Sequence, residues 1–235
     1  MSDKTVLIIG CAARKDQGAL DEIELAISEY SPEVWTLNNC FLETIRSDRH
    51  FQLHGFQTMI EAHGYEYMHK LSTMDCPLVL FEKEANGWDE HYPELKRPKV
   101  IVYPKESALA LVAGREYFDN SFPWMIAMAV LEGRTRLIMA GLDYGLAAEK
   151  RKDLIRTAEV IDSLFRNEGQ VPLGFLEDFV RVVRSEESWA IPCIMYHLGI
   201  ARGVGMETVI IGENHGLFHD RWGGLYGVAA CAGGR

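Results

Sequence analysis

The hydrophobic pattern alternates between short apolar runs and longer segments with helical periodicity. Runs suited to buried strands lie at 5–9, 34–37, 51–54, 77–81, 99–103, 137–140 and 206–211. Segments with the apolar spacing of helices lie at 19–30, 56–70, 107–113, 121–132, 147–168, 176–183 and 193–202. Strands that alternate with helices are typical of a parallel sheet covered on both faces. The pattern therefore predicts an α/β, Rossmann-like fold with a mostly parallel sheet, helices on both faces and a helical excursion.

The segment 117–145 is the most informative part of the chain. Asn120 or Ser121 can cap a helix whose first turn contains Pro123, where a missing N–H costs little. The following strand, 137–140, leads into a loop containing Gly141, Asp143 and Tyr144. Because open α/β sheets bind ligands at the carboxyl ends of their strands, we expect Ser121 and Asp143 to face one crevice. The alternative is that they are an ordinary capping serine and a turn aspartate.

Polar and glycine-containing turns also follow the first three strands. Gly10, Cys11 and Ala12 follow the first strand, but they lack the G-x-G-x-x-G dinucleotide pattern. Arg14 lies close enough to meet a phosphate, although an isolated loop cation is more often exposed.

Asn38 and Asn39 follow the second strand. Their amides can hydrogen-bond a base or a ribose, and asparagines are also common turn formers. His54, at the end of the third strand, is more often a packed residue than a catalyst.

The remaining segments have weaker assignments. We expect 82–98 to be a surface loop, because it is polar and contains glycine and proline. One domain is predicted for 1–235, with a helical insertion at about 147–184 suited to a lid or a dimerisation arm. Glu186 and Glu187, placed before the helix at 193–202, could bind ribose hydroxyls or favour the helix dipole. Glycines around the His215 and His219 pair argue against a metal site there.

The composition of the chain narrows the classes of partner that we expect it to bind. A net charge of −10 argues against an extended nucleic-acid interface or an anionic membrane surface. Five cysteines without a CxxC pair are typical of reduced thiols in the cytosol. The chain lacks a signal-peptide pattern and a run of about 20 apolar residues. We therefore expect a soluble cytoplasmic protein whose partner is a small molecule.

Several segments, taken in order, resemble the sialyltransferase-like Rossmann group. The group includes bacterial sialyltransferases, MptE-like diphosphokinases and flagellin-modifying proteins, and the nearest pattern is that of Rossmann-like proteins of tailed phages. The matching segments are VLIIGCAARK, VWTLNNCFLE, DNSFPWMIAMAVLEGRTRLIMAGLDYG and EESWAIPCIMYHLGIARGVGMETVIIG, about half of the chain.

The resemblance implies a nucleotide lying across the strand ends. In the sialyltransferases, a Gly-Asn-Gly turn contacts the nucleotide; the resemblance places Gly10 and Ala12 over its glycines, with Cys11 in place of the asparagine. It further implies nucleotide contacts from Asn38, Ser121, Gly141 and Asp143. A family asparagine at the end of the third strand falls on or near His54.

Three functions follow from this pattern. The first is a glycosyltransferase-like transferase that uses a nucleotide-activated donor. The family's histidine base falls where this chain has SEESWAIP, so Glu187 or His54 would deprotonate the acceptor. The second is an ATP-dependent diphosphokinase, the one alternative that needs a cofactor, with Asp143 holding Mg²⁺. The third is a non-catalytic, nucleotide-sequestering phage protein. Homo-oligomerisation is compatible with all three.

Overall fold

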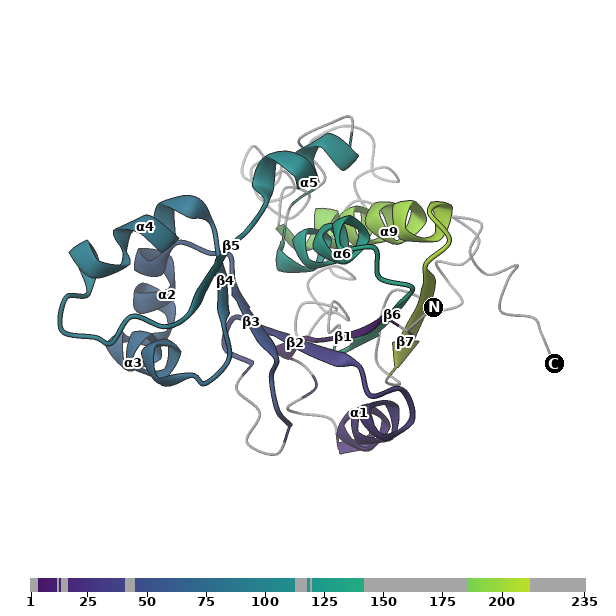
Figure 1. The fold of residues 1–235 in the computed structure, drawn as a ribbon, viewed down its shortest axis with the longest axis horizontal. Helices are drawn as coiled ribbons and strands as arrows, with labels where there is room; N and C mark the ends of the chain where they lie inside the picture. Colours follow the sequence, from purple (N-terminus) through teal and green to yellow (C-terminus); the bar gives the residue numbers. More distant parts are fainter. Residues whose placement is uncertain are drawn as a thin grey trace, which may run out of the picture.

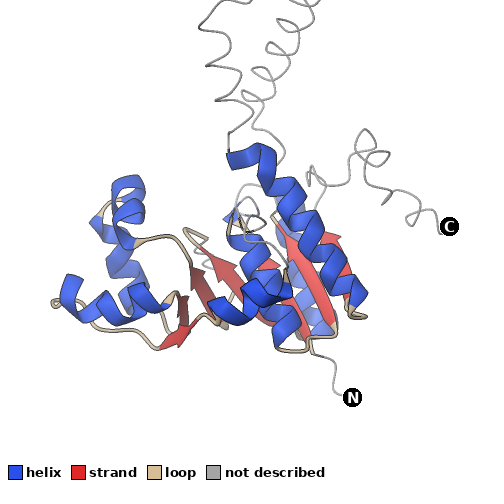
Figure 2. Cartoon of the chain, turned by 90° about the horizontal axis from the view of Figure 1, so that it is seen from above, coloured by secondary structure: helices blue, strands red, loops and turns tan. Residues whose placement is uncertain are grey.

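A seven-stranded, entirely parallel sheet forms the centre of the protein (Figure 1). The computed structural model describes residues 4–11, 13, 17–40, 45–112, 118, 120–141 and 186–211, and in the last range it leaves out the side chains of 186–192 and 195. The strands are β1 (Thr5–Ile9), β2 (Glu33–Leu37), β3 (Arg49–Gln52), β4 (Leu78–Leu80), β5 (Val100–Val102), β6 (Arg136–Ala140) and β7 (Glu207–Ile211). Their order is β5-β4-β3-β2-β1-β6-β7, and Figure 2 shows them as one twisted row.

Helices cover both faces of this sheet, as the pattern predicted. They are α1 (Gln17–Tyr30), α2 (Phe56–His63), α3 (Tyr65–Thr73), α4 (Glu82–His91), α5 (Lys105–Leu111), α6 (Ser121–Leu131) and α9 (Glu186–Gly203). In β1, Val6 and Ile8 pack under α6 and α9, whereas Leu7 and Ile9 pack under α1. This alternation buries every β1 side chain, because successive residues of a strand point to opposite faces. The α/β, Rossmann-like prediction is therefore confirmed.

The region 82–98 corrects one prediction. Its polar composition indicates a surface loop, but Glu82–His91 is the helix α4. Ala85, Trp88 and Tyr92 lie on one side of this helix and are buried against the helices α2 and α3 and the strand β4. The high proportion of charged residues concealed this helical spacing, because those charges occupy the opposite, solvent-facing side.

Three boundaries also differ from expectation. The segment 56–70 is two helices, because Gly64 interrupts it with a φ of 76°. The third strand ends at Gln52, so His54 lies two residues beyond it. The helix α9 begins at Glu186 and not at residue 193, so Glu186 and Glu187 lie inside the helix and not before it. The predicted insertion at 147–184 lies outside the described residues.

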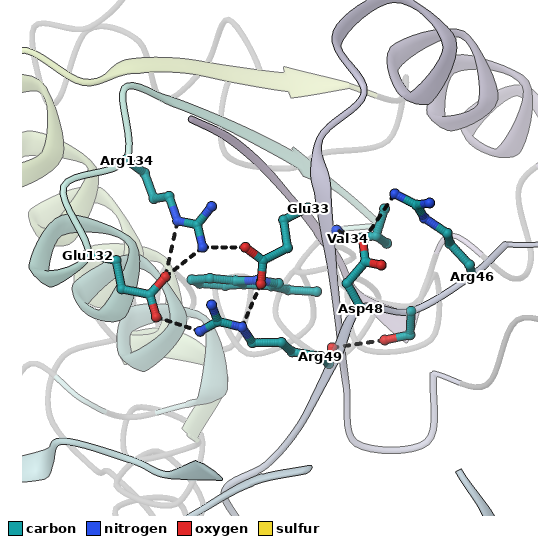
Figure 3. Close-up of polar contacts among 9 residues, drawn as sticks. Glu33, Val34, Arg46, Asp48, Arg49, Glu132 and Arg134 are labelled. Carbon is teal, nitrogen blue, oxygen red and sulfur yellow. Dashed lines mark hydrogen bonds and ion pairs between the residues drawn. The ribbon is translucent and has the colours of Figure 1, made fainter. Parts of the chain in front are cut away.

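A closed set of ion pairs holds the amino ends of the strands together (Figure 3). Arg134 pairs with Glu33 and Glu132, and Arg49 pairs with the same two carboxylates. Both guanidinium groups lie over the Trp35 ring, 5.2 and 5.4 Å from its centroid. We call these four charged residues the ion-pair square. It lies at the edge of the sheet opposite the strand ends considered below, so its role is structural.

Within the described ranges, none of the helices combines the length and the apolarity that a membrane crossing requires.

Candidate functional site

The strand order defines where a ligand is expected. From β1, the chain adds β2, β3, β4 and β5 on one side, and later adds β6 and β7 on the other. The order therefore reverses between β1 and β6, and open α/β sheets bind ligands at the carboxyl ends of the strands beside such a switch point. Gly10 and Gly141 follow directly after β1 and β6.

These two glycines are packed against each other. A Cβ on Gly10 would lie 2.4 Å from the Gly141 carbonyl oxygen and 2.6 Å from the Phe122 ring. A Cβ on Gly141 would lie 2.5 Å from the Gly10 carbonyl oxygen, and Gly141 has a φ of +66°. Glycine at both positions is thus explained by the close approach of two turns. That these glycines also contact a nucleotide stays a prediction.

The helix α6 begins beside this glycine contact. Asn120 caps it, since its Oδ1 accepts a hydrogen bond of 3.0 Å from the Phe122 N–H. Pro123 has no N–H to offer, so the start of α6 presents few backbone donors to an anion. Ser121 is 3% exposed, and its Oγ has no hydrogen-bond partner among the described residues. Because buried polar atoms are nearly always paired, this hydroxyl is a notable exception.

A second unpaired atom lies at the carboxyl end of β2. The turn Leu37–Cys40 is closed by a hydrogen bond of 2.9 Å from the Cys40 N–H to the Leu37 carbonyl. Asn38 adopts a φ of +50°, and its N–H donates to the Phe51 carbonyl at 2.9 Å. Its Oδ1 is buried and has no partner in the described part of the chain. The adjacent Asn39 accepts a hydrogen bond from the Cys11 thiol at 2.7 Å.

The structure therefore brings several predicted residues to one edge of the sheet. Those placed there are Gly10, Cys11, Asn38, Asn39, Ser121 and Gly141. The predicted residues outside the described ranges are Ala12, Arg14, Asp143 and Tyr144. Glu186 and Glu187 lie in the first turn of α9, and their side chains are not among those described. At about 1.5 Å per residue, α9 is longer than any of the strands, and Figure 2 shows its first turns extending past the strand ends.

His54 lies on the same edge but is exposed. Its carbonyl accepts a hydrogen bond of 3.0 Å from the Gln52 side-chain amide, and the Tyr67 hydroxyl donates to the other end of that amide. Burial raises the pKa of Tyr67, so this phenol stays protonated and continues to donate. The backbone at His54 is thus fixed from inside the sheet.

His50, to which the sequence pattern assigned no role, is fully buried on β3. Its Nδ1 lies 2.8 Å from the Thr36 Oγ1, and its ring also hydrogen-bonds the backbone of Asn38. Thr36 in turn contacts the Ser47 hydroxyl at 2.7 Å. His50 therefore links the interior of the sheet to the turn that carries Asn38. The predicted strand began at residue 51, so the burial of His50 and Gln52 within one strand was not apparent.

His50 gives the protein a predicted acid sensitivity. Burial lowers its pKa to about 4, so the folded state holds the ring neutral while the unfolded state protonates it near pH 6.5. The unfolded state then binds more protons between these values, and stability falls as pH drops from about 6.5 to 4, by roughly 3 kcal/mol. Urea unfolding measured at several pH values from 7 to 4 should show this loss. The free energy of unfolding should depend less steeply on pH in His50→Gln than in the wild type. An equal dependence on pH in the two proteins would contradict the prediction.

His197 is a second buried histidine that the predictions did not assign a role. Its Nδ1 lies 2.8 Å from the Cys193 carbonyl, so this nitrogen donates and Nε2 carries the lone pair. Nε2 is buried and has no partner within the described ranges. The centroid of the His197 ring lies 4.5 Å from that of the Phe118 ring. Phe118 in turn stacks on Trp124 near the start of α6. Burial lowers the pKa of His197 and favours the neutral ring.

Among the described residues, no group of three or more His, Cys, Asp or Glu side chains could hold a metal ion. Asp143, the ligand expected for Mg²⁺, is outside those residues, so the metal dependence of the diphosphokinase alternative stays a prediction.

No family model matches the chain. No curated protein matches its sequence. One solved structure that is similar is the sialyltransferase CstII from Campylobacter jejuni, in complex with the substrate analogue cytidine-5'-monophosphate. The identity is 11%, the TM-score is 0.45, and the match covers 90% of this chain and 80% of CstII. A TM-score below 0.5 supports no inference about the family or the activity of this chain.

Proposed function

We propose that the protein binds a nucleotide or nucleotide-sugar at the carboxyl ends of β1, β2 and β6. The observation that carries this proposal is the pair of buried, unpaired oxygens, Asn38 Oδ1 and Ser121 Oγ, at the edge beside the switch point. Neither has a partner among the described residues. A buried polar atom without a partner costs about 1–3 kcal/mol, and a ligand that supplies the missing hydrogen bond removes this cost. Two such atoms at the expected edge favour a polar ligand there.

The chemistry of the two oxygens narrows the ligand. An amide oxygen such as Asn38 Oδ1 only accepts hydrogen bonds. A fully ionised phosphate has no hydrogen to donate, so Asn38 suits a ribose hydroxyl or an amino group on the base. Ser121 Oγ can both donate and accept, so it suits either the ribose or a phosphate oxygen. This division of roles fits a nucleoside with attached phosphates better than it fits an inorganic anion.

The phosphates would need positive charge, because the chain has a net charge of −10. The first turn of α1 and the preceding Arg14 are the candidates, since helix amino termini and arginine side chains both stabilise phosphates. We further propose that the bound nucleotide is an activated sugar donor and that the protein is a glycosyltransferase-like transferase. Glu187 or His54 would then take the proton from the acceptor hydroxyl, and Glu186 would bind a ribose.

Thermal unfolding against a panel of CMP-, UDP- and ADP-sugars, ATP with Mg²⁺ and cyclic nucleotides tests binding. A ligand present at a hundred times its dissociation constant stabilises a protein by about 2.7 kcal/mol. For a chain of this length we expect a rise in Tm of roughly 5–10 °C. Slow hydrolysis of a stabilising sugar nucleotide would support transfer, and strictly Mg²⁺-dependent stabilisation by ATP would support the diphosphokinase instead. No shift with any ligand would contradict nucleotide binding.

Ser121→Ala provides a sharper test. The substitution removes an unpaired buried hydroxyl, so the free protein should be as stable as wild type or slightly more stable. Nucleotide affinity should fall about tenfold, because one hydrogen bond to the ligand is lost. Ser72→Ala is a matched control, because Ser72 is equally buried but its hydroxyl donates to the His69 carbonyl inside α3. Equal affinity in both variants, measured by titration calorimetry, would remove Ser121 from the site.

A further inference from the structure

Two cysteines connect the carboxyl ends of β1 and β2. The Cys11 thiol donates to Asn39 Oδ1 at 2.7 Å and lies 3.7 Å from the Leu37 carbonyl oxygen. In the opposite direction, the Cys40 thiol donates to the Gly10 carbonyl at 3.5 Å. Each sulfur therefore contacts the backbone segment that carries the other. Neither residue is in a disulfide.

The backbone geometry keeps the two residues close. The Leu37 carbonyl oxygen accepts the Cys40 N–H at 2.9 Å and is also contacted by the Cys11 sulfur. The strands β1 and β2 pair in parallel up to Ile9 and Thr36, so the two turns begin from adjacent positions. A disulfide needs Cα atoms about 4.4–6.8 Å apart, roughly the spacing of neighbouring strands. Each sulfur already lies against the turn that carries the other cysteine, which places the two thiols within one small region at these strand ends.

The two thiols differ in access. Cys11 is half-buried, so a small oxidant can reach it, whereas Cys40 is 1% exposed. The other described cysteines, Cys76 and Cys193, are buried and lie in different parts of the fold. This arrangement, with one accessible thiol and one protected neighbour, is that of an attacking and a resolving cysteine.

We propose that Cys11 and Cys40 form a redox-active pair that closes to an intramolecular disulfide. A low-molecular-weight disulfide such as oxidised glutathione is the oxidant. The Cys11 thiolate attacks it, forms a mixed disulfide and releases one reduced glutathione. The Cys40 thiolate then attacks the Cys11 sulfur and releases the second. Both protein thiols lose a proton and together give two electrons, which the two glutathione sulfurs receive.

The disulfide would act on the proposed nucleotide site, and this consequence rests on the proposed function. Oxidation of Cys11 removes the thiol hydrogen, so the hydrogen bond from Cys11 to Asn39 Oδ1 is lost. The turn Leu37–Cys40, which carries Asn38 in its φ of +50°, is at the same time tied to the turn after β1. Because the Asn38 oxygen lies in the turn that the disulfide constrains, the oxidised protein should bind nucleotide about tenfold more weakly, the loss expected for one hydrogen bond.

The experiment compares the full chain after incubation with oxidised glutathione and after incubation with reduced glutathione. Peptide mass mapping of the oxidised sample should show Cys11 linked to Cys40, with Cys76 and Cys193 still alkylatable. Cys40→Ser should stop at the glutathione adduct on Cys11, and Cys11→Ser should give neither product. If both single variants fold but the wild type gives no linked peptide, the proposal that Cys11 and Cys40 form a disulfide is overturned.

Nucleotide binding is measured in the same samples with the ligand that stabilises the reduced protein most. Weaker binding by the disulfide form that recovers on reduction supports the regulatory consequence, and equal binding by both forms overturns it. If the disulfide forms but neither form binds any nucleotide, the redox pair stands and the proposed nucleotide site fails.

Discussion

Replacing Gly141 with alanine is expected to destabilise the protein by about 3 kcal/mol or more. A non-glycine residue in the left-handed region costs roughly 1–2 kcal/mol. At this position the new Cβ would also lie 2.5 Å from the Gly10 carbonyl oxygen and 2.6 Å from the Ala13 nitrogen. Backbone atoms cannot move aside as a flexible side chain can, so the two turns after β1 and β6 must separate.

Gly133→Ala is the matched control for this prediction. Gly133 has a nearly identical φ of +63°, but no atom lies within 4 Å of the position that an alanine methyl group would occupy. It should therefore lose only about 1–2 kcal/mol, the backbone cost alone. Urea unfolding of both variants isolates the contact between the two turns. Equal losses would show that the turns are not packed against each other.

Arg134→Ala should cost about 2–4 kcal/mol, because it breaks the ion-pair square. The Arg134 side chain is 12% exposed, and its removal leaves Glu33 and Glu132 to share Arg49. Burial acts to raise the pKa of Glu33, but hydrogen bonds from Trp35 and Arg134 and the charges of Arg49 and Arg134 lower it overall. Two partly buried carboxylates that share a single guanidinium group are costly, although their partial exposure places the loss below that of a fully buried pair.

Arg136→Ala is the control that separates the cost of breaking the ion-pair square from the cost of losing an arginine in general. Arg136 pairs with the exposed Glu207 at 2.8 Å and should cost only about 0–1 kcal/mol. The lowered pKa of Glu33 adds a pH signature: its contribution is present above the unfolded value near 4.5 and is lost as pH falls below it. The difference between wild type and Arg134→Ala in urea unfolding should therefore shrink below about pH 4. A difference that stays constant down to about pH 3 would contradict the ion-pair account.

The strands were predictable where they are short and mostly apolar, whereas β3, with the sequence RHFQ, was located only in part. Strands such as Thr5–Ile9 and Arg136–Ala140 are buried on both faces, and the sequence records this directly as a continuous hydrophobic run. The helix α4 was missed for the opposite reason. Its buried side chains, Ala85 and Trp88, are separated by polar positions within a charged segment, and only tertiary packing shows which side is covered.

The site was predictable in outline and not in detail. Parallel topology alone brings the turns after β1, β2 and β6 to one edge, together with the amino end of α6. Asn38 and Ser121 could therefore be nominated from their positions. The hydrogen bond between Cys11 and Asn39 could not be predicted from the sequence, because it depends on the left-handed turn at Asn38. The ion-pair square was equally hidden, since Glu33 and Arg134 are 101 residues apart.

A crystal structure of the protein with the nucleotide that stabilises it most tests the central claim directly. The account predicts that the nucleoside lies at the carboxyl ends of β1 and β6, with a donor hydrogen-bonded to Asn38 Oδ1 and a polar atom within hydrogen-bond distance of Ser121 Oγ. A nucleotide bound at the amino ends of the strands, beside the ion-pair square, or anywhere that leaves both oxygens unpaired would contradict it.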